Sequence, residues 1–282
     1  MRQLKIDFGT NILVTSVASS TGLNLSTFLN DQVNSIVGID SQEVIFEFGR
    51  FIKSPSAHGT DLFPNFLTQI KAQYDIDRIY LCNDHEIRSL SIDTSINNSS
   101  YSLVPKKTLL LFQNKTQSSN YMKQYGFDVP KICNPQNMLL NSKYFLKNNY
   151  SYHRPKFLEV FEFTGEDIPD FDPQNIYCTD YIEGIEISID CYLDSNSNKL
   201  YALARKRLEI IDGISTKAEF IQKDSLIRML KKVLIDTELF GFSCSQFISN
   251  EQGDFFIEIN TRCGGGLKLS LDNKLFSDMY SY

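Results

Sequence analysis

Short apolar runs alternate with amphipathic stretches over the first third of the chain. The apolar, strand-like runs are residues 11–17, 35–39 and 78–82, and the helical patterns between them are 23–29 and 62–74. Strands that alternate with helices predict a parallel sheet in a Rossmann-like domain, and ligands of such sheets bind beyond the carboxyl ends of the strands. Asp40 and the segment 83–86 follow two of these strands. We therefore expect them at a ligand-binding edge.

The pattern changes after a polar segment at residues 93–102, which we interpret as a loop and a domain boundary. Helical patterns at 107–112 and 116–125 come next, and from residue 144 the alternation becomes that of antiparallel strands. The expected strands are 144–147, 157–163, 176–181, 186–193, 200–208, 218–221, 244–249 and 255–260, with one helix at 224–239 and a hairpin turn at 250–253.

These patterns predict a fold of the α/β and α+β classes. A Rossmann-like parallel-sheet domain would occupy residues 1–105, and a two-lobed domain with antiparallel sheets would occupy 106–282. The two lobes of the larger domain are expected at 106–182 and 183–282.

Composition narrows the class of protein without naming a function. The chain has 282 residues, a formal net charge of -6 and 42% hydrophobic residues, enough for a sizeable core. The mild acidity argues against a large nucleic-acid surface, and no apolar run approaches the roughly 20 residues of a membrane span. The N-terminus lacks the pattern of a signal peptide, so we expect a cytoplasmic protein. The six cysteines form no CxxC pair, which favours buried reduced thiols.

Polar side chains gather near the end of the chain. Gln246 lies on one strand of the predicted hairpin, and Glu258 and Asn260 lie two residues apart on the other, so both point to one face. Such oxygen ligands suit Mg²⁺, which takes one or two carboxylates together with phosphate oxygens. Arg262 continues the alternation and could bind a phosphate, and the glycines at 264–266 would let backbone N–H groups approach an anion. The alternative is a polar outer face with a glycine-rich exit.

Residues 257–266, IEINTRCGGG, resemble the EINPR-x-GGG hairpin of ATP-grasp ligases of the carbamoyl-phosphate synthetase type. The resemblance implies that Gln246, Glu258 and Asn260 bind Mg²⁺, or Mn²⁺ in its place, and that Arg262 contacts phosphate or substrate. Thr261 replaces the usual proline, a change that removes no ligand. The N-terminal domain resembles the small α/β domain that precedes the ATP-grasp domain in this branch.

Residues 180–190, DYIEGIEISID, resemble the nucleotide-binding segment of the same family. In the family the backbone of a strand linker holds adenine and acidic side chains hold the ribose. The resemblance implies that Glu183 or Glu186 lies at the ribose and that three residues lie near adenine, namely Asp180, Tyr181 and Ile182. A solvated strand face is the alternative.

Basic residues complete the implied ATP site. Lys115, before an amphipathic helix, and Lys147, at the end of an apolar strand, resemble the two phosphate-binding lysines of the family. Arg205 and Arg207 share a strand face and, with Asp212-Gly213 after them, resemble its R-x-R strand pair, which implies an anion clamp. Each of these groups could instead be a solvated surface charge.

The segment after Lys147 departs from the family. Its relatives carry a glycine- and serine-rich loop that closes over the phosphates, whereas residues 148–155, NNYSYHRP, contain no glycine. Backbone groups cannot wrap a phosphate as closely without glycine. We therefore expect side chains to take over this contact, from Ser151, His153 or Arg154.

The resemblance implies a two-step reaction without a side-chain nucleophile. A carboxylate attacks the γ-phosphate of ATP to give an acyl phosphate and ADP, and an amine or similar nucleophile then displaces phosphate; catalysis is positioning and charge neutralisation. A carboxylate or carbamate kinase-like enzyme and an inactive nucleotide-binding module stay open as alternatives. A Rossmann dehydrogenase is disfavoured because no GxGxxG is present. A second subunit could complete the substrate side, which leaves a homodimer open.

Overall fold

The computed structural model describes residues 9–58, 62–92, 101–134, 137–150, 158–165, 175–211 and 214–267. Contacts within the chain divide it into two compact units, each assembled from separate stretches. The first unit comprises Met1–Leu109, Ile189–Cys244 and Thr261–Tyr282, and the second comprises Leu110–Ser188 and Ser245–Asn260. The domain boundary between residues 105 and 106 stays a prediction.

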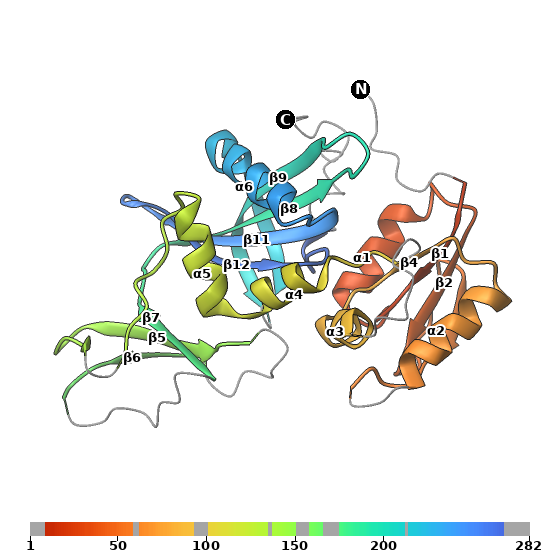
Figure 1. Cartoon of the computed structure of the whole chain (residues 1–282), viewed down its shortest axis with the longest axis horizontal. Helices are drawn as coiled ribbons and strands as arrows, with labels where there is room; N and C mark the ends of the chain where they lie inside the picture. Colours follow the sequence, from red (N-terminus) through yellow and green to blue (C-terminus); the bar gives the residue numbers. More distant parts are fainter. Residues whose placement is uncertain are drawn as a thin grey trace. The chain divides into compact units, whose positions relative to one another are not determined.

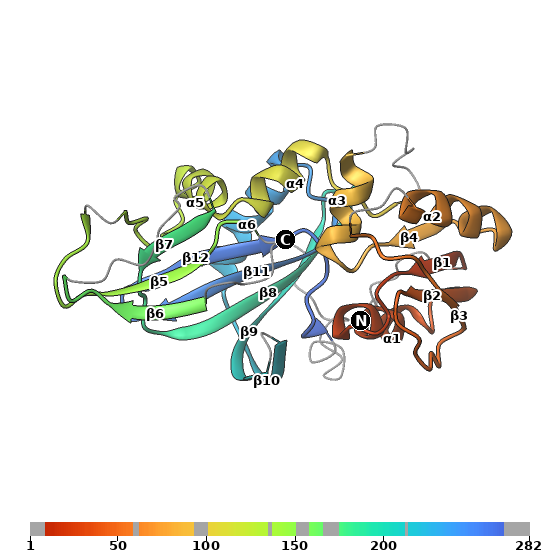
Figure 2. The ribbon, with the colours of Figure 1, turned by 90° about the horizontal axis from the view of Figure 1, so that it is seen from below.

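A four-stranded parallel sheet with the order β3-β2-β1-β4 forms part of the first unit. Its elements are β1 (Asn11–Val14), α1 (Ser20–Leu29), β2 (Ser35–Asp40), β3 (Arg50–Lys53), α2 (Leu62–Gln73), β4 (Arg78–Tyr80) and α3 (Asp84–Ile92). The strand order reverses between β3 and β4, so right-handed crossovers place α1 and α2 on opposite faces of the sheet (Figure 2). The carboxyl ends of β1 and β4 therefore form the switch point at which such sheets bind ligands.

The central strand explains why this sheet could be predicted. Ile12, Leu13 and Val14 of β1 are fully buried, as expected for a parallel strand that is covered on both faces and therefore reads as a continuous apolar run. The pattern misses two elements. β3, with the sequence RFIK, is a short and partly exposed edge strand, and the charged first turn of α3 reads as a loop.

A second sheet has five strands in the order β10-β9-β8-β11-β12. Its strands are β8 (Ile185–Leu193), β9 (Leu200–Ile211), β10 (Ile214–Ile221), β11 (Gly241–Asn250) and β12 (Gly253–Asn260). β9 and β10 pair in antiparallel fashion, with register shifts near Lys217. The amphipathic helix α6 (Asp224–Asp236) precedes β11 and buries five apolar side chains, Leu226, Ile227, Leu230, Val233 and Leu234. The predicted α/β and α+β fold class is confirmed.

The second unit contains an antiparallel sheet with the order β6-β5-β7. Its strands are β5 (Lys143–Asn148), β6 (Leu158–Glu162) and β7 (Ile176–Asp180), and the helices that precede them are α4 (Lys106–Gln113) and α5 (Lys115–Gln124). α5 packs along β12 (Figure 1). Gly126 follows α5 with a φ of 85°, the left-handed conformation that ends many helices.

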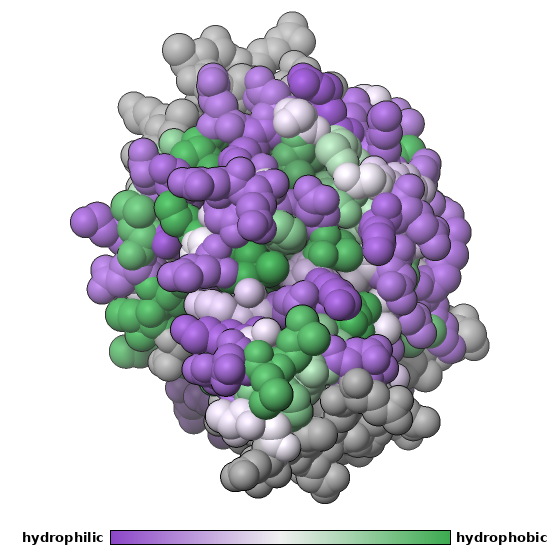
Figure 3. All heavy atoms as spheres, turned by 90° about the vertical axis from the view of Figure 1, so that its left-hand side faces the viewer, coloured by the Kyte–Doolittle hydropathy of each residue, from purple (hydrophilic) through white to green (hydrophobic). Residues whose placement is uncertain are grey.

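The surface shown in Figure 3 mixes hydrophilic residues with scattered hydrophobic ones, as on most proteins. None of the helices in the described part of the chain is both long enough and apolar enough to cross a membrane. All six cysteines are buried free thiols, which confirms the interpretation made from their spacing.

Candidate functional site

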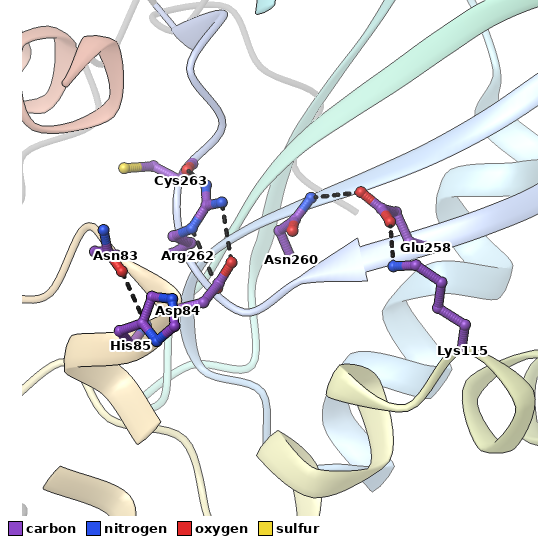
Figure 4. Close-up of polar contacts among 8 residues, drawn as sticks. All are labelled: Asn83, Asp84, His85, Lys115, Glu258, Asn260, Arg262 and Cys263. Carbon is purple, nitrogen blue, oxygen red and sulfur yellow. Dashed lines mark hydrogen bonds and ion pairs between the residues drawn. The ribbon is translucent and has the colours of Figure 1, made fainter. Parts of the chain in front are cut away.

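The β11–β12 hairpin places two of the predicted metal ligands side by side. Asn260 Nδ2 donates to Glu258 Oε1 at 3.3 Å, so the two side chains meet on β12 as their spacing predicts (Figure 4). Ring contacts within the second unit fix this hairpin, since Phe247 lies 6.1 Å from Phe127 and 5.8 Å from Phe256 between ring centroids.

Lys115 reaches Glu258 from the neighbouring helix. It is the first residue of α5, whose start is fixed by Asn114, because the Asn114 side chain accepts a hydrogen bond from the Gln117 N–H at 2.9 Å. The Lys115 ammonium lies 2.9 Å from Glu258 Oε2 in a largely buried ion pair. Lys115 and Glu258 are 143 positions apart in the sequence, so the fold alone brings this pair together.

Lys147 adds a second positive group to this cluster. Its side chain on β5 is buried, with Nζ 5.3 Å from the centre of the Tyr177 ring. Burial lowers the pKa of Lys147 to about 7, and the nearby charge of Lys115 acts in the same direction, while Glu258 and Glu186 oppose the shift. A buried lysine with so low a pKa is suited to binding an anion, because the negative charge of the anion would favour the protonated form of the lysine.

Glu258 stays ionised in these surroundings. The charge of Lys115 lowers the pKa of Glu258 to about 2, against the effect of burial and with help from Lys147 and Asn260. The charges of two amines thus act on one carboxylate, in a region that is largely shielded from water. Such an arrangement can bind a cation and a polyphosphate together.

The donor set fits Mg²⁺ with phosphate oxygens better than a zinc site. Among the residues that the structure describes, no group of three or more His, Cys, Asp or Glu side chains could hold a metal ion. Glu258 would supply the charge and Asn260 an amide oxygen, and Mg²⁺ commonly uses so few protein ligands when phosphates supply the rest. Gln246 is half-buried on β11, next to β12 in the sheet; its convergence on Glu258 and Asn260 stays a prediction.

The predicted adenine segment follows β7. The N–H groups of Asp180 and Tyr181 already donate to the carbonyls of Lys131 and Lys143, both at 3.0 Å. The next backbone donor along the chain is the N–H of Ile182, and the contact of this segment with adenine stays a prediction.

Of the two predicted ribose ligands, Glu186 is the better connected to the cluster. Its charge acts on Lys147, whereas the described contact near Glu183 is structural: its carbonyl accepts from Asn250 Nδ2 at 2.9 Å. Both side chains are exposed. Gly184 lies between them, and a Cβ there would come within 2.6 Å of the Ser249 carbonyl oxygen, so the chain passes too close to β11 for any other residue.

Arg262, in the first unit, makes a two-pronged ion pair that the sequence did not predict. Its Nε and Nη2 lie 3.2 Å from Asp84 Oδ1 and Oδ2, respectively (Figure 4). Burial alone would lower the pKa of Arg262, but Asp84 more than offsets this effect, so the pKa lies above its ordinary value. The only sequence signal for Asp84 was its place in the polar segment at the carboxyl end of β4.

The expected clamp of Arg205 and Arg207 does not form as an exposed anion site. Arg205 is buried, and its Nε donates to Asp190 Oδ2 at 2.9 Å. Its charge is therefore paired with a carboxylate inside the protein. Arg207 is half-buried on β9, opposite Ala218 of β10. Its role at the phosphates stays a prediction.

The glycine run after Arg262 packs on this internal ion pair. A Cβ on Gly266 would lie 2.4 Å from Arg205 Nη2, and one on Gly264 would lie 2.9 Å from Asp190 Oδ1. From the sequence, the glycines were expected to expose N–H groups to an anion. The structure gives a second reason why glycine is needed here: the backbone approaches a buried guanidinium–carboxylate pair too closely for a side chain.

Two sequence predictions fall outside the described residues. They are the loop contacts expected from Ser151, His153 and Arg154, and the Asp212-Gly213 pair of the R-x-R motif.

Comparison with known proteins gives a family match for part of the chain and structural matches for its fold. Residues 172–274 match the family described as ATP-grasp in the biosynthetic pathway with Ter operon. No curated protein matches the sequence. The match contains the predicted metal ligands and the adenine segment, but not Lys115 or Lys147.

Several solved structures share the fold at low sequence identity. N5-carboxyaminoimidazole synthetase from Staphylococcus aureus, complexed with ADP, has a TM-score of 0.70 at 14% identity, over 95% of this chain and 74% of that one. L-amino acid ligase from Bacillus licheniformis has a TM-score of 0.65 at 9% identity, over 95% and 70%.

A third similar structure is the biotin carboxylase domain of 2-oxoglutarate carboxylase from Hydrogenobacter thermophilus, in complex with MgADP, ADP and bicarbonate. It has a TM-score of 0.62 at 13% identity, over 91% of this chain and 65% of that one. The family match therefore covers the part of the chain that carries the motif at 257–266, and the solved structures share the fold of nearly the whole chain.

Proposed function

We propose that this protein is an ATP- and magnesium-dependent ligase of the carbamoyl-phosphate synthetase type. It activates a carboxylate as an acyl phosphate, releases ADP, and joins the acyl group to an amine or a similar nucleophile. The observation that carries the proposal is the cluster of Lys115, Lys147 and Glu258, in which Lys115 contacts an ionised carboxylate and the charge of Lys147 acts on the same group. The complexes of the similar structures with ADP and with MgADP support it.

Each group of the cluster has a task in this reaction. Glu258, Asn260 and Gln246 would hold the metal ion, which when bound neutralises charge on the phosphate oxygens. Lys147, buried and readily deprotonated, gains its proton as the phosphates enter, and Lys115 can turn from Glu258 to a phosphate oxygen. Ile182 would meet adenine through its N–H, and Glu186 would meet the ribose.

No side chain has to act as a nucleophile. The substrate carboxylate oxygen forms a bond to the γ-phosphorus while the bond to the β-phosphate oxygen breaks, and the amine then forms a bond to the acyl carbon while phosphate leaves. Arg262 and Arg207 would oppose the negative charge that develops in these steps. The work of the protein is to hold the reactants in line and to neutralise charge.

The test is ADP formation with panels of carboxylic acids and amines in the presence of Mg²⁺. We expect ADP only when both an acid and an amine are present, with a product whose mass is that of the two substrates less one water. Glu258→Gln should abolish turnover, whereas Glu251→Gln, an exposed glutamate in the β11–β12 turn, should behave as wild type.

Other outcomes would redirect the assignment. ADP formation with a carboxylate alone would replace the ligase by a carboxylate kinase, and nucleotide binding without turnover would indicate an inactive module. Turnover at the wild-type rate in Glu258→Gln would remove the basis of the proposal.

A further inference from the structure

We propose that Asp84 is a positioning residue, whose carboxylate fixes the guanidinium of Arg262 for contact with the phosphoryl group or the substrate. This inference rests on the proposed function, because it takes Arg262 to act on the reacting groups. Asp84 comes from the N-terminal parallel sheet, a part of the chain that the family match at 172–274 does not include.

The geometry of the pair restricts Arg262 to one orientation. Both contacts with Asp84 are 3.2 Å long and join the two prongs of the guanidinium to the two carboxylate oxygens. Side-chain exposure is 21% for Arg262 and 17% for Asp84, so the pair is screened less than one in open solvent. A planar, two-pronged contact fixes direction as well as distance.

Arg262 keeps donors for another partner. One Nη1 N–H donates to the carbonyl of Cys263 at 3.2 Å, and Asp84 takes one N–H on Nε and one on Nη2. A guanidinium has five N–H donors, so these contacts use three and leave two for an anion. Asp84 therefore orients the guanidinium without occupying all of its N–H donors.

Asp84 is itself held firmly. It is the first residue of α3, and the side chain of Asn83 caps the helix by accepting a hydrogen bond from the His85 N–H at 2.8 Å. Two residues farther on, Glu86 is buried and accepts hydrogen bonds from the hydroxyls of Thr15 and Ser16 at the end of β1. The first turn of α3 is thus tied to the switch point between β1 and β4.

The backbone that carries Arg262 is fixed from its other side. Gly264 and Gly266 pack within the first unit against the buried pair of Asp190 and Arg205, at distances that leave no room for a Cβ. The guanidinium is therefore held at its tip by Asp84 and at its base by the glycine turn. A catalytic charge that is oriented before the substrate arrives costs no reorganisation during the reaction.

The experiment compares Asp84→Asn, Asp84→Glu, Arg262→Lys and the double variant Asp84→Asn with Arg262→Lys. Asp224→Asn is the matched control, because Asp224 is also the first residue of a helix, α6. Four quantities are measured: the rate at which phenylglyoxal modifies Arg262, mapped by mass spectrometry; the Kd for Mg·ATP; and kcat and KM in the assay for ADP.

We expect phenylglyoxal to modify Arg262 several-fold faster in Asp84→Asn, because the carboxylate that holds both prongs of the guanidinium is lost. We expect kcat to fall by about 10- to 100-fold, which is the effect of losing one charged hydrogen bond. The Kd for Mg·ATP should change by less than about two-fold. Asp84→Glu should recover part of kcat. The double variant should be no slower than Arg262→Lys, because Asp84 acts only through Arg262.

Three results would overturn the inference. One is a reactivity of Arg262 that does not change in Asp84→Asn, which would mean that the pair does not exist in solution. Another is a kcat in Asp84→Asn that equals or exceeds that of the wild type. The third is a double variant in which the two losses add. A wild-type protein that neither binds nor turns over ATP would instead reject the proposed function, and the phenylglyoxal result would still decide whether Asp84 orients Arg262.

Discussion

Lys115 lies 2.9 Å from Glu258, so an amine neutralises the one carboxylate among the predicted metal ligands. An ammonium group and Mg²⁺ would compete for the same oxygens. Binding of Mg·ATP must therefore move Lys115 from Glu258 to a phosphate oxygen, or the two cations would share the carboxylate at a cost in repulsion.

Replacing Lys115 should change metal and nucleotide affinity in opposite directions. We expect Lys115→Met to bind Mn²⁺ several-fold more tightly in the absence of nucleotide, because a competing charge is gone. The same variant should bind ATP about 10- to 100-fold more weakly, since a charged contact with phosphate is lost. Electron paramagnetic resonance of Mn²⁺ and calorimetric titration with ATP measure the two effects. Lys123→Met, at an exposed position of α5, is the control; equal changes in both variants would rule out the exchange.

Lys147 should destabilise the folded protein and strengthen its binding of ATP. Because burial lowers the pKa of Lys147 to about 7, the folded state binds this proton less tightly than the unfolded chain does. We expect Lys147→Met to raise the melting temperature at pH 7 and to lower ATP affinity by about ten-fold or more. Lys143→Met, at the exposed start of the same strand, should change neither property. A lower melting temperature in Lys147→Met would show that the lysine stabilises the fold.

Glu86 should make a contribution to the free energy of unfolding that depends on pH. Burial raises the pKa of Glu86 from 4.5 to about 7, against the hydrogen bonds from Thr15 and Ser16. Between these values the folded state binds more protons than the unfolded state, so the contribution of Glu86 to the free energy of unfolding falls as pH rises from 4.5 to 7. Glu86→Gln removes this dependence and can still accept from one hydroxyl and donate to the other.

The measurement is urea unfolding of wild type and Glu86→Gln at several pH values. We expect the variant to gain stability relative to wild type as pH rises, up to roughly 3 kcal/mol above pH 7. The exposed Glu47→Gln should show no such trend. A difference between Glu86→Gln and wild type that does not vary with pH would show that Glu86 does not titrate in this range.

Gly266 should be intolerant of a methyl group because of Arg205. Its Cβ would lie 2.4 Å from Arg205 Nη2, and Asp190 prevents the guanidinium from moving away. We expect Gly266→Ala to lower the free energy of unfolding by roughly 1–3 kcal/mol, typical of overpacking. In an Arg205→Met background the same change should cost less. Equal costs in the two backgrounds, measured by urea unfolding, would mean that the clash is with another group.

The parts of the site that could be predicted depend on short-range periodicity. Glu258 and Asn260 meet because alternate residues of a strand share a face, and the sequence shows this spacing directly. The strands and helices of the sheet around β1 follow from the same kind of pattern.

The parts that could not be predicted depend on tertiary contacts. Arg262 and Asp84 are 178 positions apart, and no period connects them. Arg205 and Arg207 look equivalent in the sequence, but only the fold shows that Arg205 is buried with Asp190. The exposed edge strand β3 has no apolar face of its own, so its pairing with β2 comes from the sheet rather than from its pattern.

The buried cysteines have a practical consequence for experiments on this protein. Burial raises the pKa values of Cys133 and Cys178 to about 12, and contact with Cys263 together with burial raises that of Cys82, so these sulfurs rarely form the reactive thiolate in the folded state. The sequence contains no tryptophan that could serve as a fluorescent reporter of unfolding. Alkylation of the cysteines can take this place: each modified sulfur marks an opening event, and ligands that bind the folded state will slow the labelling.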